Sequence, residues 1–177
     1  ARAANDNAKR TPAELVALAR YGLGQGTTGR YNWVSAGSGD NYARWNASAT
    51  EADATGIADY RNVVNTFGYV VEIDPYSPTS APKKRSALGR FAHEAAVFGK
   101  PVVGKPLAVY SGDDSRNEYI FKFVSAAPWD AADANPTSGF AAGDKYLNRG
   151  TLYVARFNAD GTGQWLPLTK ATIPATY

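Results

Sequence analysis

LAVYSGDDSRNEYIFKFV, residues 107–124, is the stretch of this chain that decides its fold. Two apolar segments with the composition of β-strands flank a polar turn, which contains Asp113, Asp114, Arg116 and Glu118. Carboxylates gathered at a strand end suit hard cations such as calcium, and a nearby arginine suits a phosphate oxygen. We therefore predict two strands joined by a candidate site for metal-assisted phosphoryl transfer. An ordinary acidic turn is the competing interpretation.

Other short apolar segments on both sides of this stretch predict an all-β fold. Residues 69–73 alternate between two faces, and the last two expected strands are joined by a hairpin turn at Gly161. Short strands separated by turn signals are typical of a sandwich, a barrel or a propeller. The expected strands are residues 69–73, 88–97, 102–103, 107–110, 118–124, 151–157 and 164–168.

One short helix is expected, near the N-terminus. TPAE, residues 11–14, has the pattern of a capping box with proline at the first helical position. The glycine-rich and asparagine-rich residues 24–66 predict a long irregular segment, and residues 125–150 predict a linker between strands.

The composition excludes several classes of function. The net charge is only +3, from 19 basic and 16 acidic residues, so nothing favours nucleic acid or a membrane surface as a partner. No segment approaches the roughly 20 apolar residues that cross a bilayer. The chain has no cysteine, which excludes disulfides and a thiol nucleophile, and its single histidine, His93, excludes a site built from two imidazoles.

Two charged residues beside this histidine form a second candidate site. Strand alternation places Arg90 and Glu94 on one face, where an exposed ion pair is favoured over a metal-ligating carboxylate. His93 is expected to be a packed, hydrogen-bonded histidine. Glu72 interrupts an apolar segment, so its side chain must be exposed, paired or bound to a ligand.

Four separated blocks of this sequence resemble one known family. In their order and approximate spacing they are similar to the PhoX-type alkaline phosphatases, over nearly the whole chain. The blocks are RYGLG at residues 20–24, NTFGYVVEIDPYSPTSAPKKRSALGRFAHEAA at 65–96, VYSGDDSRNEYIFKFVS at 109–125 and GTLYVARFNADGTGQWLPL at 150–168.

The resemblance implies a secreted or periplasmic β-propeller that hydrolyses phosphate esters with a cluster of calcium and iron ions. Carried over by position, Glu94 looks like a calcium-ligating carboxylate. Asp113, Asp114 and Glu118 lie where the family's acidic turn approaches the cluster. Arg116 is the matching basic residue, and its role as a clamp on the phosphate is inferred from its chemistry.

The chain also departs from the family pattern. It lacks the cysteine that bridges iron and the downstream Arg-Pro-Glu motif. We therefore expect an internal piece of a longer enzyme, inactive in isolation, with a small phosphate ester as the substrate of the monomeric parent. Residues 1–66 would be the helix and an irregular insertion, and residues 67–177 the strands of about two blades of a six-bladed propeller. The alternative is a non-catalytic β domain stabilised by calcium.

Overall fold

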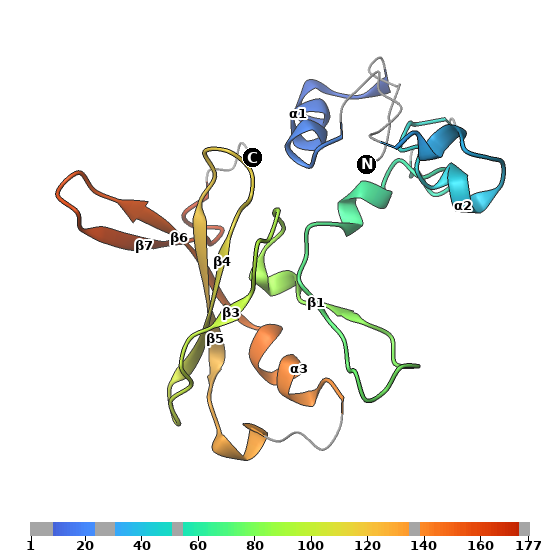
Figure 1. The fold of residues 1–177 in the computed structure, drawn as a ribbon. Coiled ribbons are helices and arrows are strands. Elements are labelled where there is room, and N and C mark those ends of the chain that lie inside the picture. Colours follow the sequence, from blue (N-terminus) through green and yellow to red (C-terminus); the bar gives the residue numbers. More distant parts are fainter. Residues whose placement is uncertain (1–8, 24–30, 51–54, 135–138, 174–177) are drawn as a thin grey trace. The chain divides into compact units, whose positions relative to one another are not determined.

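Two units, Ala1–Phe67 and Gly68–Tyr177, make up the chain, which is described by a computed structural model. The structure describes residues 9–23, 31–50, 55–134 and 139–173. A five-stranded antiparallel sheet dominates the second unit, with strands in the order β3-β4-β5-β6-β7 (Figure 1). These strands are β3 (Val97–Phe98), β4 (Pro106–Gly112), β5 (Ile120–Pro128), β6 (Gly150–Phe157) and β7 (Gly163–Pro167).

The core of this unit lies on one face of the sheet. Burial alternates along β4 and β5, so that Leu107, Val109, Phe121 and Phe123 point to the same side. Phe123 is only 2% exposed. The predicted strands at residues 107–110, 118–124, 151–157 and 164–168 are therefore confirmed, with shifted ends. The hairpin between β6 and β7 is also confirmed, because Asn158 N donates to Thr162 O at 2.9 Å.

A helix covers this core, where the sequence predicted only a linker. The helix α3 (Ala141–Leu147) buries Tyr146 and Leu147 against Leu107, Val109 and Phe123 (Figure 1). Seven residues are too few for a stable isolated helix, so α3 depends on this packing. The expectation of a single N-terminal helix is wrong for this reason.

A two-stranded ladder, β1 (Val71–Glu72) with β2 (Lys83–Lys84), is tied to α3 by a buried arginine. Arg85 is 1% exposed, and its Nε donates to Glu72 Oε2 at 2.6 Å. Its Nη1 donates to Asp144 Oδ1 at 2.6 Å and to Asn148 Oδ1 at 2.8 Å. Of the three possibilities for Glu72, the structure therefore shows pairing.

Two of the predicted strands are absent from the described residues. Residues 88–97 contain a 3₁₀ turn, η4 (Ser86–Leu88), and then an irregular segment that reaches β3. Leu88 and Phe91 are both buried, and a separation of three residues is incompatible with the alternation of a strand. Residues 102–103 lie in a turn before β4, with both valines more than half exposed.

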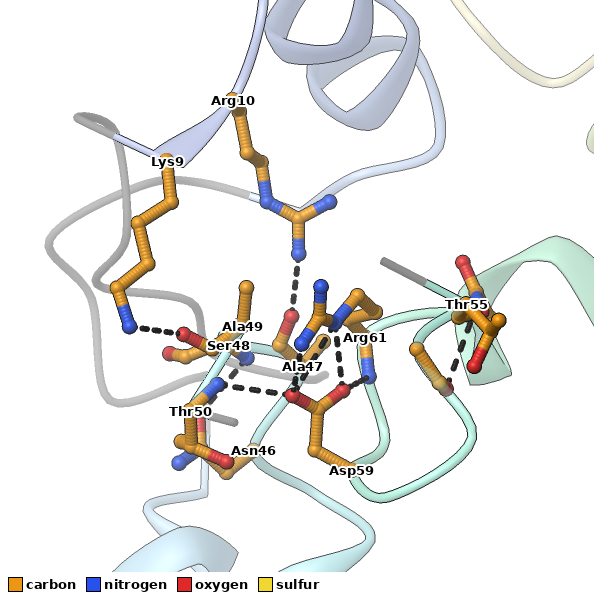
Figure 2. Close-up of polar contacts among 12 residues, drawn as sticks. Lys9, Arg10, Asn46, Ala47, Ser48, Ala49, Thr50, Thr55, Asp59 and Arg61 are labelled. Atoms are coloured by element: carbon orange, nitrogen blue, oxygen red, sulfur yellow. Dashed lines mark hydrogen bonds and ion pairs between the residues drawn. The ribbon is translucent and has the colours of Figure 1, made fainter. Parts of the chain in front are cut away.

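The first unit is held by short helices and polar contacts. The capping box of α1 (Pro12–Arg20) is confirmed, because Thr11 and Glu14 bond reciprocally. Figure 2 shows Asp59, whose carboxylate accepts hydrogen bonds from Arg61 Nε at 2.8 Å and from Thr50 N at 2.9 Å. The other short helical elements of this unit are η2 (Trp33–Ser35), α2 (Asp40–Ala43) and η3 (Val63–Thr66).

The described fold is mostly β, with one five-stranded and one two-stranded antiparallel sheet and few helices. Neither sheet closes into a barrel. The expected propeller, and its division into blades, remain predictions. Within the described residues, no helix has the length and apolarity to cross a membrane.

Candidate functional site

The acidic turn predicted from the sequence connects β4 to β5. Asp113 N donates to Tyr119 O at 3.1 Å, so the hydrogen-bonded pairing of β4 with β5 continues one residue beyond Gly112 and Ile120. The Asp113 carboxylate then accepts a hydrogen bond from Ser115 N at 3.1 Å. Asn117 has a φ of 64°, which an asparagine tolerates and which helps the chain to turn back. These contacts fix the backbone of the turn that carries Asp114, Arg116 and Glu118.

A second segment brings Glu94 to this turn. His93 and Asp113 form an antiparallel bridge, flanked by hydrogen bonds from Glu94 N to Gly112 O and from Asp114 N to Ala92 O, both at 3.0 Å. Glu94 and Asp114 are therefore diagonal positions of the bridge, which lie about 7–8 Å apart in a regular ladder. Two residues with carboxylates that are 20 positions apart in the sequence (94 and 114) thus lie as diagonal neighbours at one end of the sheet.

His93 itself packs into the protein. Its Nδ1 lies 2.8 Å from Ser111 Oγ and its Nε2 lies 3.2 Å from Gly89 O. The ring centroids of His93 and Phe91 are 3.6 Å apart. Burial lowers the pKa of His93, although the Gly89 carbonyl and the Asp113 charge oppose this shift. The prediction of a packed, hydrogen-bonded histidine is confirmed. Ser111, a polar residue at a core position of β4, was not identified from the sequence.

Three charged side chains at this end of the sheet are left without a protein partner in the described part of the chain. Glu94, Asp114 and Arg116 are exposed, and no hydrogen bond or ion pair joins their side chains to a described residue. The favoured ion pair between Arg90 and Glu94 is therefore not formed. The bridge makes Glu94 and Asp114 diagonal neighbours, and their exposed carboxylates have no partner among the described residues.

The donor set suits calcium better than iron. Calcium takes six to eight oxygen ligands, and Glu94 and Asp114 can supply some of them, with others from water or from further residues. Among the described residues, no three histidine, aspartate or glutamate side chains gather closely enough to hold a metal ion by themselves. The chain has no cysteine, and His93 is held by Ser111 and Gly89, so the described residues offer a metal carboxylate oxygens rather than sulfur or imidazole nitrogen.

Comparison with known proteins gives the family. Residues 5–177 match the family described as Alkaline phosphatase PhoX. The chain belongs to the PhoX alkaline phosphatase family. A solved structure of Pseudomonas fluorescens PhoX, in complex with vanadate, a transition state analogue, is 37% identical with a TM-score of 0.69. The resemblance that the four sequence blocks indicated is thereby confirmed.

The match is nearly complete for this chain and partial for its relative. It covers 98% of this chain and 27% of the Pseudomonas fluorescens PhoX chain. The search of curated proteins found no match. The PhoX family consists of metallo-phosphatases that are secreted or periplasmic, and their substrates are small phosphate esters. This chain therefore spans about a quarter of the length of Pseudomonas fluorescens PhoX.

Proposed function

We propose that this chain supplies part of the active site of a calcium- and iron-dependent alkaline phosphatase that hydrolyses phosphate monoesters in the periplasm or outside the cell. The observation that carries the proposal is the bridge between His93 and Asp113, which brings Glu94 beside Asp114. Both carboxylates lie at an exposed edge and have no protein partner among the described residues. Family membership favours a functional role for these carboxylates over an ordinary acidic turn.

In this proposal the side chains have separate roles. Glu94 and Asp114 bind calcium through carboxylate oxygens, with Asp113 and Glu118 as further ligands from the same turn. Bound calcium would neutralise the negative charge of the phosphate ester. The Arg116 guanidinium, which lies in the same turn, donates hydrogen bonds to a phosphate oxygen and orients the ester. Iron would be held by residues outside the described part of this chain.

The experiment is a charge-neutralising substitution in the full-length protein. Glu94→Gln keeps the size of the side chain and removes its charge, and Asp130→Asn is a control at an exposed carboxylate outside the turn. We expect Glu94→Gln to lower kcat for a phosphate monoester while the melting temperature changes little. A fall in melting temperature with unchanged kcat would contradict the proposal and favour a calcium-stabilised, non-catalytic domain.

A further inference from the structure

Ser111 carries a hydroxyl at an apolar position of the sheet. Its side chain points to the core face of β4 with Leu107 and Val109, and the residue is 9% exposed. The small cavity beside it is lined by apolar side chains and by His93. A buried hydroxyl is costly unless it is hydrogen-bonded, so the contacts of Ser111 indicate why a serine is present at this position.

The segment that leads from Glu94 to β3 contains one residue more than the segment opposite it. His93 is bridged to Asp113, and Val97 pairs with Tyr110. Between these two pairs the chain advances four positions on the Glu94 side and three positions on the β4 side. One extra residue in one of two antiparallel segments is a β-bulge, which leaves a backbone group without its ladder partner and re-aims the neighbouring side chains.

Burial along this segment agrees with a bulge. His93 packs inward, the next two residues, Glu94 and Ala95, are both exposed, and Ala96 packs against the core again. In a regular strand consecutive side chains point to opposite faces. Counted back from the exposed Val97, such alternation would turn Glu94 toward the core. The bulge therefore turns the Glu94 side chain to solvent.

The Ser111 hydroxyl lies at this bulge and contacts the residues on both sides of Glu94. Its Oγ donates a hydrogen bond to Ala95 O and lies 2.8 Å from His93 Nδ1. The backbone of Glu94 is held at the next position of β4, because Glu94 N donates to Gly112 O at 3.0 Å. One hydroxyl thus connects both sequence neighbours of Glu94 to β4.

We propose that Ser111 is a positioning residue for calcium: its hydroxyl closes the bulge after Glu94 and so fixes the Glu94 carboxylate beside the acidic turn. The inference rests on the proposed function, in which Glu94 is a calcium ligand. Ser111 itself is buried and acts only through Glu94. Residues that hold a metal ligand in place typically change metal affinity by about 10–100-fold when they are replaced. Loss of this hydroxyl should therefore weaken calcium binding.

A purely structural role is the competing explanation, and Ser125 provides the matched control for it. Ser125 lies on β5 and is 3% exposed. Its Oγ accepts a hydrogen bond from Leu107 N at 2.9 Å and donates one to Ala127 O at 2.7 Å. Neither contact involves the segment that carries Glu94. Ser111→Ala and Ser125→Ala should therefore cost similar stability, and only Ser111→Ala should change calcium binding.

The calcium affinity of the full-length protein tests the inference. A chelator removes the bound metal, and equilibrium dialysis then measures calcium binding by the wild type and the variants. We expect Ser111→Ala to bind calcium about tenfold more weakly than Ser125→Ala does. Ser111→Thr keeps the hydroxyl and should bind calcium as the wild type does. Equal calcium affinities of Ser111→Ala and Ser125→Ala would overturn the inference.

Glu94→Gln in the same experiment separates this inference from the proposed function. If Glu94→Gln binds calcium as tightly as the wild type, the proposed function fails, and the role of Ser111 fails with it. If Glu94→Gln binds calcium weakly while Ser111→Ala binds it like Ser125→Ala, only the role of Ser111 fails.

Amide hydrogen exchange needs no substitution, so it remains decisive if Ser111→Ala does not fold. A bulge that Ser111 holds keeps its backbone hydrogen bonds without calcium. In the metal-depleted full-length protein, the amides of Glu94 and Asp114 should therefore exchange several-fold more slowly than that of Arg116. The Arg116 amide donates no hydrogen bond to a described residue. Equal exchange rates for the three amides would refute the inference, because calcium rather than Ser111 would then order the segment.

Discussion

Arg85 is a buried charged residue that joins separate elements of the second unit. It connects Glu72 of β1 with Asp144 and Asn148 at α3, and it is almost fully buried. The side chains of Glu72 and Asp144 are 30% and 40% exposed, so water stabilises them in part if the arginine is lost. Breaking an ion pair by removing one buried partner is far more costly than losing a surface pair.

Arg85→Met should therefore destabilise the full-length protein by about 3 kcal/mol, because it removes the buried cation that pairs with Glu72 and leaves Asp144 with Lys83 alone. Lys84→Met is the matched control, since Lys84 is the preceding residue and its side chain is exposed. The measurement is the free energy of unfolding in urea. Equal unfolding free energies for the two variants would show that Arg85 contributes no more than a surface residue.

Gly143 is required because α3 approaches the side chains of Glu72 and Arg85 closely at this position. A Cβ at this position would overlap with Glu72 Oε2 and Arg85 Nη2. Alanine normally favours a helix over glycine by about 1 kcal/mol. We expect the opposite sign here, with Gly143→Ala lowering the melting temperature. Gly161→Ala is not a suitable control because Gly161 has a φ of 83°; Ala141→Gly, at an exposed α3 position, tests the ordinary helix effect.

At the scale of elements, α3 is attached to β2 by charge as well as by its apolar face. Lys83 Nζ donates to Asp144 Oδ2 at 2.6 Å, and Arg85 Nη1 donates to Asp144 Oδ1. The hydrogen bonds from Lys83 and Arg85 lower the pKa of Asp144 to about 2. The ionised form of this carboxylate is therefore favoured in the folded protein.

The acid dependence of stability follows from this shift. The Asp144 contribution is complete above its usual pKa of 3.8 and is lost as the pH falls from 3.8 to about 2, because the unfolded chain then binds the proton more readily. We expect the unfolding free energy of Asp144→Asn to depend less on pH in this window than that of the wild type. The unfolding free energy of Asp130→Asn should depend on pH as in the wild type. Urea denaturation over this pH range is the measurement. An unchanged acid dependence in Asp144→Asn would contradict the role of this carboxylate.

The sequence predicted some elements and missed others for identifiable reasons. Strands β4 to β7 were found because their apolar runs are long and bounded by polar turns. The segment 88–97 was misassigned because its apolar residues suggested alternation, whereas Leu88 and Phe91 are buried from an irregular backbone that includes Gly89 at φ 95°. Helix α3 was missed because its seven residues are stabilised by tertiary packing, which local sequence does not record.

The candidate site was predictable in composition and less so in geometry. The turn contains Asp113, Asp114, Arg116 and Glu118, which are near neighbours in the sequence. They therefore lie close together in any fold, and the sequence alone predicts this. That Glu94 joins them depends on the bridge at His93, a long-range contact. The expected pair of Arg90 with Glu94 is not formed, because strand alternation does not apply to the irregular segment that contains both residues.

At the scale of the whole molecule, the chain corresponds to 27% of the Pseudomonas fluorescens PhoX chain. The described residues bring two available carboxylates together without completing a metal site. We therefore expect the 177-residue chain alone to hydrolyse a phosphate monoester no faster than a buffer blank, because most ligands of the proposed cluster lie elsewhere. Turnover by the purified chain that a chelator abolishes would contradict this prediction.

The central claim is that Glu94 and Asp114 hold calcium in the assembled phosphatase. The most direct test is the calcium content of the full-length protein, measured by elemental analysis after dialysis against limiting calcium, for the wild type, the double variant Glu94→Gln with Asp114→Asn, and the control Asp130→Asn. We predict that the double variant loses calcium relative to the other two proteins while it remains folded. Equal calcium content in all three proteins would contradict the account.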